Sequence, residues 1–139
     1  MAIIQGMCSS FKEELLKAIH DLPNDTLKLA LFESSATLTK STTAYAASNE
    51  SSGTGYTAGG ATVANVTVTL SGDVAFINFD DVTWNNVTLS TRGALLYNSS
   101  KSNRAIAVFD FGENKTLSNG DITIQLPLDN AANAILRIS

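Results

Sequence analysis

Alternation of apolar and polar residues with a period of two is the feature that most constrains the fold of this chain. It starts with TLKLALFE at residue 26 and recurs in NVTVTLS, VAFINF, GALLYN, RAIAVFDF, DITIQL and AILRIS. Such alternation gives each segment one buried face and one solvated face, as an antiparallel sheet requires. Turn-forming sequences separate the segments every 8 to 12 residues or so, roughly the spacing of β-sandwiches and jelly rolls. We therefore expect a mainly β domain, an antiparallel β-sandwich or jelly roll.

The apolar phase of these alternations defines the predicted core. A shift of one residue in register would expose all the apolar residues of a strand, so the burial of these residues can be tested strand by strand. The side chains expected to be buried are Leu29, Leu31, Val66, Val68, Leu70, Ile77, Phe79, Leu95, Ile106, Val108, Ile122, Ile124 and Leu136.

One amphipathic helix is expected before the strands, over about residues 9–22. Its apolar stripe has members four residues apart: Phe11, Leu15 and Ile19. Ser10 and Glu13 fit a capping box at its start. Because a helix this short is marginal in water alone, we expect the stripe to pack on the β domain. The chain then forms one domain over 1–139, with its β core at about 26–33 and 62–139.

The segment at about 34–60 lacks periodicity and is expected to be a long irregular arm or loop. Its glycine run is not a phosphate loop, because no Gly-Lys-Ser/Thr ends it and a strand rather than a helix follows. Glycine permits positive φ and close backbone approach, so the run either reaches a neighbouring chain or folds closely over its own sheet. With little apolar area to offset ordering, we expect the segment to be mobile in a free subunit. The residues assigned to this interface are Tyr45, Gly53, Gly55, Tyr56, Gly59 and Gly60.

Charge and hydropathy exclude several classes of partner. The net charge is −4 and the nine Lys and Arg residues are scattered, so no nucleic-acid partner is expected. No apolar run reaches the length of about 18 residues that a transmembrane helix needs, so we expect no membrane partner. The start of the sequence does not have the pattern of a secretory signal, which we therefore do not expect.

No constellation of catalytic or metal-binding residues is recognisable. His20 and Cys8 are the only histidine and cysteine, so no His/Cys metal cluster can form. We expect His20 to cap the end of the helix, Cys8 to be a reduced and inert thiol, and Trp84 to be a core anchor. The sequence thus predicts a protein that is not an enzyme and needs no cofactor or metal.

Nearly the whole chain resembles a family of small structural proteins of tailed bacteriophages. The stretches that carry the resemblance include FKEELLKAIHDL, TTAYAASNESSGTGYTAGGATV, TRGALLYNSSKSNRAIAVFDFG and DITIQLPLDNAANAILRIS. The resemblance implies a virion component, assembled in the bacterial cytoplasm, with no catalytic residues to carry over. It does not separate a capsid protein from a tail protein.

Three functions are compatible with these features. The first is a capsid cement or decoration protein that binds across junctions of the major capsid protein, stabilises the shell and contacts copies of itself. The second is a tail-associated baseplate, fibre or adaptor protein, which would occur in fewer copies per particle. The third is a carbohydrate-binding module that stacks sugars on Trp84, Tyr97 or Tyr56.

Overall fold

The chain is mainly β with one short N-terminal helix, as expected. The structure is a computed structural model that describes residues 3–124 and 137–138. Its elements in chain order are β1 (Gly6–Met7), α1 (Ser9–Leu16), β2 (Leu27–Phe32), β3 (Ala61–Thr62), β4 (Thr67–Ser71), β5 (Val74–Asn78), β6 (Val82–Asn98), the 3₁₀ helix η1 (Ser99–Lys101), β7 (Arg104–Ile124) and β8 (Arg137–Ile138).

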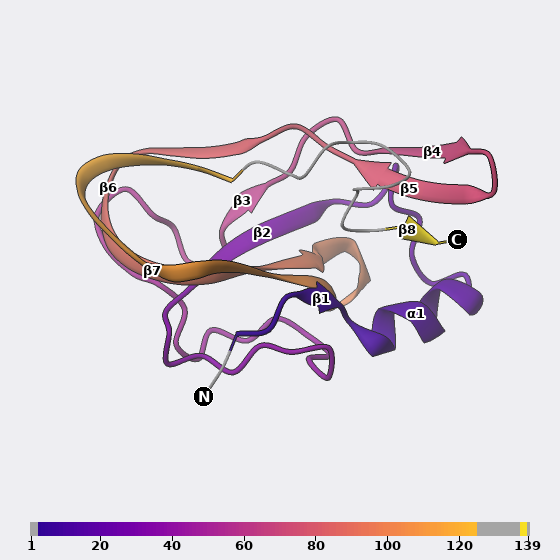
Figure 1. Ribbon diagram of the computed structural model, residues 1–139, viewed down its shortest axis with the longest axis horizontal. Coiled ribbons are helices and arrows are strands. Elements are labelled where there is room, and N and C mark those ends of the chain that lie inside the picture. The colour runs from indigo at the N-terminus through magenta and orange to yellow at the C-terminus, as the bar shows by residue number, and fades with distance from the viewer. Residues whose placement is uncertain (1–2, 125–136, 139) are drawn as a thin grey trace.

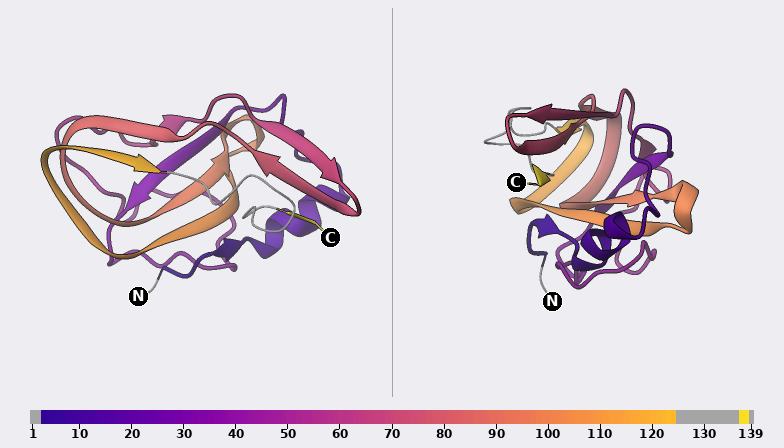
Figure 2. Two further views of the ribbon diagram at one scale, coloured as in Figure 1. Left: turned by 45° about the horizontal axis from the view of Figure 1, so that its top comes forward. Right: turned by 90° about the vertical axis from the view of Figure 1, so that its right-hand side faces the viewer.

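Two antiparallel sheets make up the domain (Figure 1). The larger has five strands in the order β1-β7-β6-β2-β3, and the smaller has three in the order β4-β5-β8. α1 lies beside β7 in the larger sheet and near the smaller sheet, at the same end of the molecule (Figure 2). The β4–β5 hairpin extends away from the larger sheet at this end.

The hairpin of β6 and β7 is much longer than the sequence pattern indicated. GALLYN, RAIAVFDF and DITIQL were expected to be separate strands, but GALLYN, RAIAVFDF and the first four residues of DITIQL belong to two continuous strands that the 3₁₀ helix η1 connects. Their pairing has irregularities at four places, between Trp84 and Leu89 and around Gly93 and Tyr97. Such bulges bend a ladder and increase its twist. The hairpin therefore curves over on itself, as Figure 1 shows.

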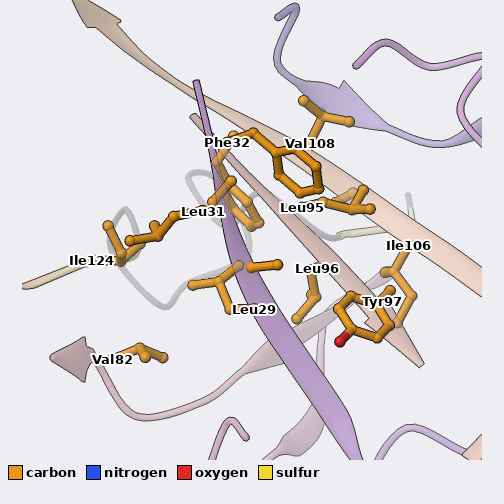
Figure 3. Packing of buried hydrophobic residues seen from close by; sticks show 14 of the residues in the cluster. Leu29, Leu31, Phe32, Val82, Leu95, Leu96, Tyr97, Ile106, Val108 and Ile124 are labelled. Atoms are coloured by element: carbon orange, nitrogen blue, oxygen red, sulfur yellow. The ribbon is translucent and has the colours of Figure 1, made fainter. Parts of the chain in front are cut away.

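Both ends of this bent hairpin contribute to one core. Val82 and Ile124, at the open end, belong to the same buried cluster as Leu95 and Val108 near the closed end (Figure 3). The predicted core residues that are buried are Leu29, Leu31, Ile77, Phe79, Leu95, Ile106, Val108, Ile122 and Ile124. Val66 is partly buried. Leu136 lies outside the described residues.

The prediction was wrong for β4. Val68 and Leu70, expected in the core, are 51% and 71% exposed. Their alternate neighbours in β4 are exposed as well, so the strand has not shifted in register. Among the described strands β4 is instead an edge strand of the smaller sheet, and its apolar side chains are exposed.

The helix begins at Ser9, as expected, but it is shorter than expected and is capped differently. It ends at Leu16, and Ala18 takes a positive φ of 58°. Cys8 is the N-cap residue without a side-chain capping bond, and the Ser10 hydroxyl has no hydrogen-bond partner. The predicted capping box is therefore wrong. Phe11 is buried, as expected of the stripe.

Replacing Val108 by alanine should lower the free energy of unfolding by about 1–3 kcal/mol, because it removes two methyl groups from a filled core. Val108 is fully buried in β7, opposite Gly6 of β1 and Leu95 of β6. Urea unfolding measures the loss. In the control, Val68→Ala at the exposed β4 position, the change should stay within about 0.5 kcal/mol. Equal losses in the two variants would contradict this assignment of the core.

Candidate functional site

The glycine-rich segment at 34–60 lies on the chain's own larger sheet. Isolated bridges join it to the larger sheet at three points, which are Phe32 with Glu50, Ala44 with Arg104, and Thr54 with Thr88. The Ser51 amide also donates to the Leu31 carbonyl at 2.9 Å. Of the two arrangements compatible with the sequence, the structure has the one in which the segment folds closely over its own sheet.

The glycines allow this close approach. A Cβ on Gly53 would lie 1.7 Å from the carbonyl oxygen of Thr88, and one on Gly60 would lie 2.0 Å from that of Leu29. Gly55 lies against the Asn86 carbonyl in the same way, at 2.8 Å. Any side chain at these positions would overlap the backbone of β2 or β6.

A carboxylate that the sequence analysis missed holds the segment in place. Glu50 accepts hydrogen bonds from the hydroxyls of Tyr45 (2.5 Å) and Tyr56 (2.6 Å) and from the Gly59 amide (2.8 Å). Tyr97 of β6 adds a bond from its hydroxyl to the Gly59 carbonyl at 2.5 Å. We call these five residues the Glu50 cluster. No sequence spacing pointed to it, because the segment has no regular periodicity.

The residues assigned to an interface therefore make contacts within the chain. Tyr45, Tyr56 and Gly59 meet at Glu50, whereas Gly53 and Gly60 lie against strand backbone. Tyr56 also accepts a hydrogen bond from the Leu31 amide of β2 at 2.9 Å. The polar groups of the two tyrosines are satisfied before any partner binds.

The Glu50 cluster predicts a loss of stability in alkaline solution. Burial, followed by the hydrogen bond to Glu50, raises the pKa of Tyr45 and of Tyr56 above the usual value of about 10. Above pH 10 or so the unfolded chain releases protons that the folded chain retains, so stability is fully present below that pH and falls as the pH rises. The melting temperature measured from pH 8 to about 11.5 should show this fall.

The matched control is Tyr56→Phe, which removes one of the titrating hydroxyls. It should be less stable than the parent at neutral pH but lose less stability between pH 9 and about 11. Parallel pH profiles for the parent and Tyr56→Phe would contradict the role given to this hydroxyl.

A second buried polar network surrounds His20. Its Nε2 donates to Glu14 at 2.8 Å, and its Nδ1 accepts from the Asn98 amide group at 2.9 Å. Asn98 also donates to Asp25 at 2.7 Å, and Arg104 donates to the other oxygen of Glu14 at 2.9 Å. His20 therefore links the turn after α1 to the closed end of the β6–β7 hairpin and does not cap helix carbonyls. With both ring nitrogens bonded, it is not placed to act as a general base.

Other residues that the sequence singled out are buried. Trp84 is in the core, as predicted, and is 8% exposed, while Tyr97 is 2% exposed. Cys8 is fully buried, and burial raises the pKa of its thiol to about 11, which makes the nucleophilic thiolate scarce. The described part of the chain contains no group of three or more His, Cys, Asp and Glu residues suited to a metal ion. None of the helices in that part is long and apolar enough to cross a membrane.

The candidate interaction site is an apolar surface around β4. A pocket of about 330 Å³ opens between α1, the turn that follows it and the β4–β5 hairpin. Its lining is mostly apolar and includes Phe11, Leu15, Leu22, Pro23, Val68 and Ile77. Val68 and Leu70 are exposed on β4 itself. We call this pocket, together with the exposed residues of β4, the β4 surface.

Comparison with known proteins does not assign a function. No family model, no curated protein and no solved structure matches this chain. A function must therefore be inferred from the surfaces that the chain presents. The Glu50 cluster is filled by the chain's own groups, whereas the β4 surface is left open to a partner.

Proposed function

We propose that this protein is a structural component of a tailed-bacteriophage virion and acts there as a capsid cement or decoration protein. In this role it binds across junctions of the major capsid protein and stabilises the shell. The observation that carries the proposal is the β4 surface, in which the exposed and uncharged residues of β4 adjoin a mostly apolar pocket. The resemblance of the sequence to phage structural proteins supports the same role.

The composition of the β4 surface suits docking on another protein. No charged residue occurs between Ala64 and Gly72, so little charge has to be desolvated when this surface is covered. Val68 and Leu70 supply exposed apolar area, and burying this area against a partner is favourable. The pocket beside them offers a site for an apolar side chain of the partner.

The Glu50 cluster supports the proposal in a different way. By holding the 34–60 segment on the domain, it presents a preorganised body to the partner. Binding then avoids the entropic cost of ordering a loop at the interface. On a shell, many identical weak contacts act together where several copies engage at once.

We further propose that the fold is a variant of the β-sandwich or jelly roll. The bent β6–β7 hairpin would supply strands to both layers around the core. This is supported by the position of Val82 and Ile124 in the same buried cluster as Leu29 and Leu31 of β2 (Figure 3).

Quantitative mass spectrometry of purified particles tests the proposed role. A cement protein should occur in a copy number of the same order as the major capsid protein and remain with tailless heads. A few copies that separate with isolated tails would favour the tail-associated alternative. Absence from washed particles would contradict a virion role altogether.

A pair of variants tests the surface. Val68→Asp places a charge on β4 where the side chain is 51% exposed, so the domain should fold but its incorporation into particles should fall at least tenfold. Ile4→Asp, at a position 58% exposed outside this surface, is the control and should be incorporated like the parent. Normal incorporation of Val68→Asp would contradict docking through the β4 surface.

A further inference from the structure

We infer that the edge of β4 that faces away from β5 pairs with β4 of a second copy of this chain, antiparallel and centred on Thr69. The three-stranded sheets of two protomers would then form one continuous sheet. The inference does not depend on the virion role, since it requires only the geometry and sequence of this edge.

In the part of the chain that the structure describes, the edge of β4 has none of the usual protection against pairing. Within the described residues, β4 pairs only with β5, and all its residues from Thr67 to Ser71 are exposed. Edge strands are commonly protected by lysine, proline or a bulge. The sequence TVTLS contains neither lysine nor proline, and its pairing with β5 runs without a shift in register. The edge is therefore a regular template for another strand.

The turn of the hairpin determines which backbone groups face outward. Ser71 pairs with Val74 across the two-residue turn at Gly72, which has a φ of 60° as a type II′ turn requires. In such a hairpin the closing pair exchanges hydrogen bonds, and every second pair along the ladder does the same. Val68 and Leu70 alternate with these pairs, so their amides and carbonyls are directed away from β5.

One register matches these groups over the whole strand. An antiparallel pairing about a two-fold axis at Thr69 sets Val68 opposite Leu70 of the second copy, and Leu70 opposite Val68. Both positions carry outward amides and carbonyls, so each pair can exchange two hydrogen bonds. On the opposite face Thr67 meets Ser71. Apolar side chains thus pair with apolar ones and hydroxyls with hydroxyls, the combinations that favour cross-strand pairing.

The distribution of charge along the strand does not oppose a second copy as the partner. The chain carries a net charge of −4, yet this register opposes no like charges at the strand. The nearest charged residue, Asp73, would lie opposite Asn65 of the second copy. An isologous contact of this kind closes as a two-fold dimer and does not continue into a fibre. The dimer would also bring the exposed Val68 and Leu70 of both copies onto one face.

Disulfide trapping tests the register. Thr69→Cys places its thiol beside that of the second copy, because residues of a non-hydrogen-bonded pair have Cα atoms about 4.5 Å apart, within disulfide range. The control is Thr67→Cys on the same face, whose own copy lies more than about 10 Å away. The native Cys8 is buried and should not interfere. Under mild oxidation Thr69→Cys should become a covalent dimer that a reductant reverses, and Thr67→Cys should remain monomeric.

Sedimentation equilibrium of the unmodified chain gives a second, independent measurement. The parent should show twice the mass of the monomer. Leu70 is 71% exposed, and the variant Leu70→Lys should show the mass of the monomer. A parent that stays monomeric while Thr69→Cys fails to cross-link would overturn the inference. Equal cross-linking of the two cysteine variants would also overturn it. Neither result would bear on the copy number in particles, which tests the proposed function separately.

Discussion

Replacing Gly60 by alanine is expected to lower the free energy of unfolding by at least about 3 kcal/mol. Gly60 has a φ of 83°, and an added Cβ would lie 2.0 Å from the carbonyl oxygen of Leu29. That carbonyl belongs to β2, where Leu29 pairs with Leu96 of β6 on one side and with Ala61 of β3 on the other. Because backbone paired on both sides has little room to move, the overlap has to be relieved by detaching the glycine segment.

The neighbouring glycine provides a matched control. Gly59 has a φ of 95°, so alanine there meets similar backbone strain, but the nearest atom to its Cβ would be the Tyr97 hydroxyl oxygen at 3.5 Å. Gly59→Ala should therefore cost only about 1–2 kcal/mol, the penalty for a left-handed conformation. Urea unfolding measures the loss in each variant, and the difference between the two losses gives the cost of the overlap between the added Cβ and the Leu29 carbonyl. Equal losses would show that Gly60 is not held against β2.

Replacing Glu50 by alanine is the second change expected to have a large effect, a loss of about 3 kcal/mol in the free energy of unfolding. It leaves the hydroxyls of Tyr45 and Tyr56 and the amide of Gly59 without their acceptor. Hydrogen bonds to charged groups contribute about 1.5–3 kcal/mol each, and part of this is regained when water reaches the freed groups. Chemical denaturation measures the loss.

The control is Glu13→Ala. Glu13 is an exposed glutamate of α1 that forms an ion pair with Lys17 at 3.1 Å. Its removal should change stability by no more than about 0.5 kcal/mol. Limited proteolysis provides a second readout, since Glu50→Ala should be cut within the 34–60 segment much faster than the parent. A parent cut there as fast as Glu50→Ala would contradict the role of the Glu50 cluster and would agree with the mobile segment that the sequence alone suggested.

Alternation in the sequence was enough to predict the strands whose apolar face the chain itself covers. Leu29 and Leu31 in β2, and Ile106 and Val108 in β7, are buried as their phase required. The same pattern failed at Leu70, because alternation marks an apolar face but does not show what covers it. The alternation of a strand is a local property of its sequence. Which elements pack on its apolar face depends on the arrangement of the whole chain.

The remaining differences have the same physical origin. The apolar stripe of the helix continues to Ile19 in the sequence, yet the chain turns at Ala18 and His20 joins the buried network with Asn98. The Glu50 cluster likewise depends on Tyr97, far along the chain. Polar contacts between distant residues leave no periodic signal. In the sequence, a segment held by such contacts therefore looks the same as a free loop.

The attachment of the 34–60 segment also has a consequence for folding kinetics. Its anchoring groups, the Leu31 amide and the Tyr97 hydroxyl, come from β2 and β6 and are brought together only when these strands pair. The segment can therefore attach only after these strands have paired, and we expect this pairing of distant strands to limit the rate of folding. Contacts that form after the transition state slow unfolding and leave the folding rate nearly unchanged. The Glu50 carboxylate would then lower the rate of unfolding and so lengthen the lifetime of the folded state.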